Sequence, residues 1–199
     1  LEANTTGSDN VAVGTDAGTA ITTGNTNIAI GGLAMQTNTV GDRNVAIGYS
    51  ALETYNPSSN EDSYNVAVGY AALEADTTGK NNTAVGGNAL LVNTTGGNNT
   101  AVGTGALDAN TTANDNTAVG RSALGANTTG TRNVAVGALA LDANTTANDN
   151  TVIGYDAATA NTTGTQNTVI GTYAFDANTT GSYNTAVGRA ALSSNTTAS

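Results

Sequence analysis

The chemistry open to this sequence is limited by the reactive side chains it holds. Its 199 residues include 15 Asp and Glu but no His and no Cys, so the commonest general base and the thiolate ligands of metals are absent. Three carboxylates, Asp108, Asp142 and Asp176, recur at the same place in alternate repeats. Paired-acid catalysis needs two carboxylates that converge in a cleft, whereas this spacing keeps them apart. We therefore predict no catalytic site, no cofactor and no enzyme.

Two Asn-Asp-Asn tripeptides, at residues 114–116 and 148–150, offer the oxygen ligands that calcium prefers. They lack the glycine-rich nonapeptide context of calcium-binding β-rolls, so we predict no metal site. The Asn-Thr-Thr tripeptides that begin at Asn93, Asn110 and Asn127 match the glycosylation sequon. Stacked coils would place these asparagines about 5 Å apart, too close for a glycan on each, and we predict a turn role for them.

The elements that position these residues follow from an internal repeat of 17 residues. With one spacing of 21, repeats begin at Asn10, Asn27, Asn44, Asn65, Asn82, Asn99, Asn116, Asn133, Asn150, Asn167 and Asn184. A short period sustained over many copies is typical of a solenoid, in which each repeat is one coil. The apolar residues alternate, which indicates strands. We predict a single all-β domain over residues 1–199, a parallel β-solenoid (β-roll or β-helix) of about eleven coils with a four-residue insertion within residues 55–64.

Alternation along each strand decides which side chains face the core. The fourth residue of each repeat is always Val or Ile, as in Val102 and Val119, and we predict that it faces inward against the recurrent Leu. The third residue, Ala or Val, would then face outward and form an apolar stripe that a second chain must cover. We therefore predict a homotrimer interface at Ala84, Ala101, Ala118, Ala135, Val152 and Val169.

The pentapeptides NIAIG at residues 27–31 and NVAIG at residues 44–48 resemble the repeat of trimeric autotransporter adhesin heads. The longer phrase NTAVGxxALxANTTG resembles the repetitive shafts of bacteriophage tail-fibre and appendage proteins, including those of phages of marine cyanobacteria. The resemblance implies a left-handed roll assembled as a homotrimer, other fibre or virion subunits as partners, and a location on a virion or cell surface. Neither family supplies a catalytic residue. The 17-residue coil is longer than the repeat typical of adhesin heads.

Charge and hydropathy exclude two classes of partner. The formal net charge is −10, and the five Lys and Arg are scattered, so no basic stripe exists to neutralise the phosphates of a nucleic acid. No apolar run approaches the roughly 20 residues needed to span a bilayer, and we predict no membrane insertion. Because the sequence opens and closes within the repeat, we expect it to be part of a longer chain.

The insertion is the one departure from the repeat, and binding residues favour loops. We assign a candidate surface contact loop to Tyr55, Glu61, Asp62 and Tyr64, and we expect Tyr49 and Tyr70 on the flanking coils to extend it. A host cell-surface receptor is the partner such a loop would contact.

The function predicted from these features is mechanical. We expect the structural shaft of a virion tail fibre or surface appendage, which spaces or contributes to receptor attachment. A self-polymerising extracellular filament subunit is one alternative. A monomeric ice-binding solenoid is another, based on the stacked Thr-Thr pairs such as Thr111-Thr112 and Thr128-Thr129. Adjacent threonines on a strand point to opposite faces, which disfavours a flat threonine array.

Overall fold

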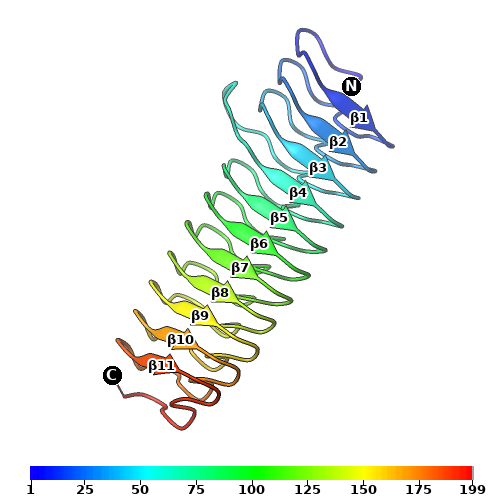
Figure 1. The fold of residues 1–199 in the computed structure, drawn as a ribbon. Helices are drawn as coiled ribbons and strands as arrows, with labels where there is room; N and C mark the ends of the chain where they lie inside the picture. Colours follow the sequence, from blue (N-terminus) through cyan, green and yellow to red (C-terminus); the bar gives the residue numbers. More distant parts are fainter. Residues whose placement is uncertain (199) are drawn as a thin grey trace.

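The chain is a single stack of coils with one short strand in each coil (Figure 1). The computed structural model describes residues 1–198. The strands, each of three residues, are β1 (Val11–Val13), β2 (Ile28–Ile30), β3 (Val45–Ile47), β4 (Val66–Val68), β5 (Thr83–Val85), β6 (Thr100–Val102), β7 (Thr117–Val119), β8 (Val134–Val136), β9 (Thr151–Ile153), β10 (Thr168–Ile170) and β11 (Thr185–Val187). They form one 11-stranded sheet in sequence order. This confirms the predicted parallel β-solenoid.

The register of the sheet follows the sequence repeat. Val102 pairs with Val119 in the parallel ladder between β6 and β7, so residues 17 apart are axial neighbours. Across the insertion, Val45 pairs with Val66. The four extra residues therefore leave the register intact, and the chain between β3 and β4 projects from the stack as a longer loop (Figure 1).

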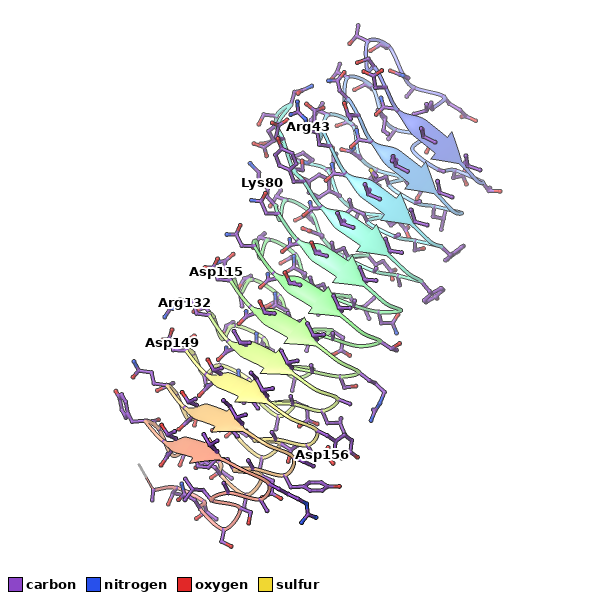
Figure 2. The ribbon with its side chains drawn as sticks, in the orientation of Figure 1. Arg43, Lys80, Asp115, Arg132, Asp149 and Asp156 are labelled. Carbon is purple, nitrogen blue, oxygen red and sulfur yellow. The ribbon has the colours of Figure 1, made fainter. Side chains whose placement is uncertain are left out.

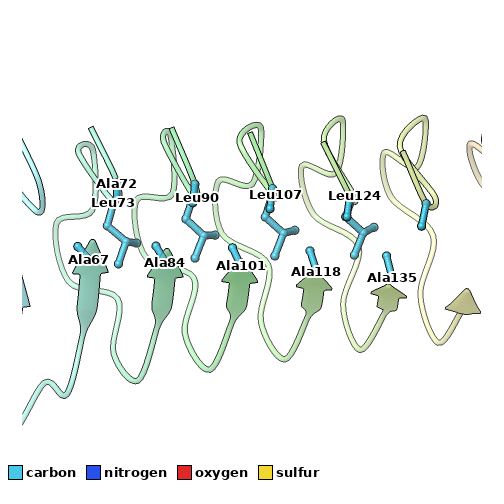
Figure 3. Packing of buried hydrophobic residues seen from close by; sticks show 14 of the residues in the cluster. Ala67, Ala72, Leu73, Ala84, Leu90, Ala101, Leu107, Ala118, Leu124 and Ala135 are labelled. Carbon is cyan, nitrogen blue, oxygen red and sulfur yellow. The ribbon is translucent and has the colours of Figure 1, made fainter. Parts of the chain in front are cut away.

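Alanine and leucine fill most of the interior, whereas the residues at the first and third positions of each strand, Val and Ile among them, face outward. Ala101 is 0% exposed while its neighbour Val102 is 36% exposed, and Figure 3 shows the strand alanines pointing toward Leu73, Leu90, Leu107 and Leu124. Our prediction of alternation was right, but the predicted direction was wrong. In so narrow a coil the Leu side chain from the opposite wall favours a small residue on the strand, which is Ala in most coils and Val at Val152 and Val169, both 0% exposed.

Tight turns close each coil and depend on left-handed backbone conformations. The Gly after each strand has positive φ, for example 135° at Gly86, where an added Cβ would lie 2.6 Å from the carbonyl carbon of Gly103. The inward Leu also has positive φ, 52° at both Leu107 and Leu124. Non-glycine residues pay a conformational cost there, which burial of the Leu side chain offsets.

Two columns of buried asparagine fasten the coils along the axis. In the column that precedes the strands, Asn116 donates its backbone N–H to Oδ1 of Asn99 at 3.0 Å and its Nδ2–H to the Gly130 carbonyl at 2.8 Å. We call the second column the turn-side ladder; it comprises Asn93, Asn110, Asn127, Asn144, Asn161 and Asn178. There Asn127 Nδ2 donates to Asn110 Oδ1 at 3.1 Å and to the Gly130 carbonyl at 3.0 Å. These amides thus join neighbouring coils and cap their own turns, except between Asn144 and Asn161, where Asn144 Oδ1 has no hydrogen-bond partner among the described residues.

Candidate interaction surfaces

The outward side of the sheet presents two rows of side chains, which we call the strand face. One row comprises Val11, Ile28, Val45, Val66, Thr83, Thr100, Thr117, Val134, Thr151, Thr168 and Thr185. The other comprises Val13, Ile30, Ile47, Val68, Val85, Val102, Val119, Val136, Ile153, Ile170 and Val187. Both rows are aliphatic from β1 to β4, and threonine dominates the first row from β5 onward. The strand face is therefore a long, exposed, largely apolar strip.

The six residues assigned to a homotrimer interface do not lie on this surface. Ala84, Ala101, Ala118, Ala135, Val152 and Val169 are each 0% exposed. All six belong to the hydrophobic core, where Figure 3 shows the four alanines, so that assignment is wrong. The strand face, and not this row, is the side of the sheet that the chain presents outward.

The candidate contact loop is tied to the coils on both sides of it. Tyr55 is 0% exposed, so its assignment as a surface contact is wrong. Asp62 forms an ion pair with Arg43 and accepts a hydrogen bond from the Tyr64 hydroxyl at 3.0 Å. Glu61 pairs with Lys80 at 2.7 Å. The structure thus brings Glu61, Asp62 and Tyr64 together at the surface, with both carboxylates already engaged by cations.

Tyr49 and Tyr70 do not extend this loop. They follow β3 and β4, whereas the loop leads into the start of β4, so they lie at opposite ends of the strands. Their rings stack on each other with centroids 5.9 Å apart and planes inclined by 10°. Gly32 and Gly87 occupy the equivalent positions of the two adjacent coils. The tyrosines form a separate exposed aromatic pair.

Tyr55 and Asp76 occupy adjacent places of the turn-side ladder, where later coils carry asparagine. Asp76 is 0% exposed. Its Oδ1 accepts the Gly79 N–H at 2.7 Å, and its Oδ2 lies 3.5 Å from Asn82 Nδ2. Burial raises the pKa of the Asp76 carboxyl to about 7 and that of the Tyr55 hydroxyl to about 12. Asp76 was not predicted as a notable residue, although an Asp in a column of Asn is a signal visible in the sequence.

The Asn-Asp-Asn and Asn-Thr-Thr tripeptides have structural roles, because their side chains hold adjacent coils and turns together. Asn114 Oδ1 accepts the Gly97 N–H at 2.7 Å, Asn148 Oδ1 accepts the Thr131 N–H at 2.7 Å, and Asp149 pairs with Arg132 at 2.7 Å. In residues 1–198 no group of three or more acidic, His or Cys side chains could hold a metal ion. The sequon residues Asn93 and Asn110 are fully buried, in agreement with the predicted turn role.

Comparison with known proteins gives no relative. No protein family, curated protein or solved structure matches the chain. Across the described residues the surface has no pocket, and no helix there is long and apolar enough to cross a membrane.

Proposed function

We propose that this chain is the structural shaft of a surface fibre on a virion or cell, which holds other parts of the fibre away from that surface. The observation that carries the proposal is the uninterrupted sheet of 11 strands in sequence order. Its hydrogen bonds, and those of the asparagine columns, run along the stack axis from coil to coil. At about 4.8 Å per strand spacing, the strands extend over about 48 Å. Such a stack resists stretching and bending without large core residues.

We further propose that identical chains associate through the strand face as a homotrimer. Val13 is 58% exposed and Ile153 is 40% exposed, and the row to which both belong continues over every coil. A continuous apolar strip of this length favours burial against another chain. Packing around a rotational axis is the simplest closed arrangement, because each copy then presents the same strip.

Sedimentation equilibrium of the purified chain tests the association. We expect the unaltered chain to sediment as a trimer and the double variant Val102→Glu/Ile153→Glu to sediment as a monomer with an unchanged circular dichroism spectrum. Ala101→Glu is the matched control, because it buries a charge in the core and should abolish folding. A monomeric unaltered chain would contradict the trimer, and long threads in electron micrographs would favour the filament alternative.

Ice binding is a second candidate, and one observation favours it. Thr83, Thr100 and Thr117 project from the same side of a regular sheet. The Thr-Thr pairs themselves are not such an array, since Thr111 Oγ1 donates to the Thr128 carbonyl at 3.1 Å. Thermal hysteresis from a monomeric chain, abolished by Thr100→Glu/Thr117→Glu, would support this function over the shaft.

A further inference from the structure

The turns that follow the strands form a ridge that carries four exposed tyrosines. Tyr49 and Tyr70 lie near one end of it, and Tyr155 and Tyr173 near the other. Asp156 projects from this ridge, on the opposite side of the strands from Arg132 and Asp149 (Figure 2). The ridge belongs to the turns and is distinct from the strand face.

Tyr155 and Tyr173 form two walls of an open corner. Their ring centroids are 5.7 Å apart and their planes are inclined by 86°. The Tyr173 N–H donates to the Tyr155 carbonyl at 3.1 Å, which fixes the two coils relative to each other. The side chains remain accessible, since Tyr155 is 45% exposed and Tyr173 is 39% exposed.

Asp156 adds a carboxylate to this corner. It follows Tyr155 in the chain and occupies the place one coil before Tyr173. A hydrogen bond to the Asp156 carboxylate, and then its negative charge, raises the pKa of the Tyr155 hydroxyl. The charge of Asp156 also contributes to the raised pKa of Asp142, after burial. Arg121 is the cation whose charge reaches Tyr155. Within residues 1–198, no cation lies over either ring.

Elsewhere in the same molecule a tyrosine and an aspartate bind a guanidinium. At the insertion, the Tyr64 hydroxyl donates to Asp62, Arg43 pairs with Asp62, and the Arg43 guanidinium lies 5.7 Å from the centroid of the Tyr64 ring. Tyrosine, aspartate and guanidinium thus form one set. Tyr155 and its chain neighbour Asp156 supply the same two residue types beside a second aromatic wall, without a guanidinium over either ring in the part of the chain that the structure describes.

We propose that Tyr155, Asp156 and Tyr173 form a binding site for an arginine guanidinium of a basic partner. A guanidinium stacks on an aromatic face and donates paired hydrogen bonds to a carboxylate. The net charge of −10 attracts a basic partner and repels an acidic one. Tyr49 and Tyr70 make a matched control pair, because the residues that follow them are Ser50 and Ala71 rather than an acid.

Titration with N-acetyl-arginine methylamide, followed by the ring NMR signals of the tyrosines, tests the site. We expect the Tyr155 and Tyr173 signals to shift and those of Tyr49 and Tyr70 to stay. Asp156→Asn should weaken binding about fivefold, and Tyr173→Leu about threefold. Tyr70→Leu should leave the affinity unchanged. Tyr70 and Tyr173 are exposed and Asp156 is half-buried, and unchanged urea midpoints verify that the three variants fold.

Two probes need no variant. The citrulline analogue keeps the shape of arginine but loses its charge, and it should produce no shift at Tyr155 or Tyr173. Equal binding of the citrulline analogue would overturn the proposal, as would an equal loss of affinity in Tyr70→Leu. Binding of the lysine analogue as tight as that of arginine would overturn the assignment to a guanidinium.

Discussion

The regular coils from β5 onward and the junction, by which we mean the stretch from β3 to the start of β5 that contains the insertion, place different chemistry at the same position. In the regular coils the turn-side ladder holds amides, such as Asn110 and Asn127, that donate to one neighbour and accept from another. At the junction the equivalent positions hold Tyr55 and Asp76, both buried. The backbone repeats through both regions, since the strand register is maintained across the insertion.

The coil backbone accommodates Asn, Tyr or Asp at this position, but only the amide of Asn donates a hydrogen bond to one neighbouring coil and accepts one from the other. An amide has both a donor and an acceptor, so a stack of amides is neutral and self-complementary at every pH. A carboxyl group donates only while it is protonated. The regular coils should therefore be indifferent to pH near neutrality, whereas the junction should weaken as Asp76 ionises.

The largest effect is expected from placing the junction's acid in the regular ladder. Asn127→Asp removes the donor to Asn110 Oδ1 and to the Gly130 carbonyl and buries a carboxylate against both oxygens. We expect the free energy of unfolding to fall by about 3–5 kcal/mol at pH 8, and by less at pH 4, where the acid is protonated. Urea unfolding at the two pH values measures this. An equal loss at both would contradict the role of charge.

The reverse substitution, Asp76→Asn, should stabilise the junction. The pKa of Asp76 is raised from 3.8 to about 7 in the folded chain, so its contribution to stability is fully present below pH 4 and is lost as the pH rises through 7. We expect Asp76→Asn to add about 2–4 kcal/mol above pH 7 and nothing at pH 4. Unfolding midpoints from pH 4 to pH 8 check this.

Asn93→Gln serves as a control for Asp76→Asn, because it perturbs the next coil without changing charge. Its effect should be the same at pH 4 and pH 8. A pH-independent gain in Asp76→Asn would show that the side chain's shape, rather than its ionisation, limits the junction.

The smallest effect is expected at the surface of the junction. Arg43→Gln removes the ion pair with Asp62 and the contact with the Tyr64 ring. Both groups of the pair are nearly half exposed, at 47% and 44%, so we expect a loss of about 0.5–1 kcal/mol that shrinks at high salt. A loss equal to that in Asn127→Asp would mean that the loop, and not the ladder, secures this region.

The repeat made the fold predictable, because the distance between successive asparagines is the register itself. Asn99 and Asn116 are joined by a hydrogen bond in the structure, as the spacing indicated. The insertion was also predictable, since a solenoid that keeps its register must expel extra residues. The parallel sheet and the asparagine columns follow from these two facts.

The direction of the strand side chains was not predicted correctly. Alternation shows which residues share a face of the strand, but it does not show which of the two faces is buried. Bulk favoured Val102 inside, but Thr100 shares its face and is polar. The interior already holds the Leu column and two asparagine columns, so only Ala101 fits between them. The volume of a closed coil, rather than hydrophobicity alone, decides the phase.

The contact between the Tyr155 and Tyr173 rings could not be predicted from the sequence, for a different reason. Tyr155 and Tyr173 are one coil and one residue apart, so they belong to adjacent columns. Only the turn geometry shows that their rings meet at 86° rather than stack like those of Tyr49 and Tyr70. Asp76, by contrast, stood in the asparagine column and was recognisable from alignment of the repeats.

The fixed register makes length a quantity counted in whole coils. Removing residues 116–132 would join Asp115 to Asn133 and shorten the object by one strand spacing, about 4.8 Å, while every remaining column stays aligned. The length of the stack can therefore change in steps of one coil for every 17 codons gained or lost. A deletion of another size would disturb the strand register at the site of the deletion.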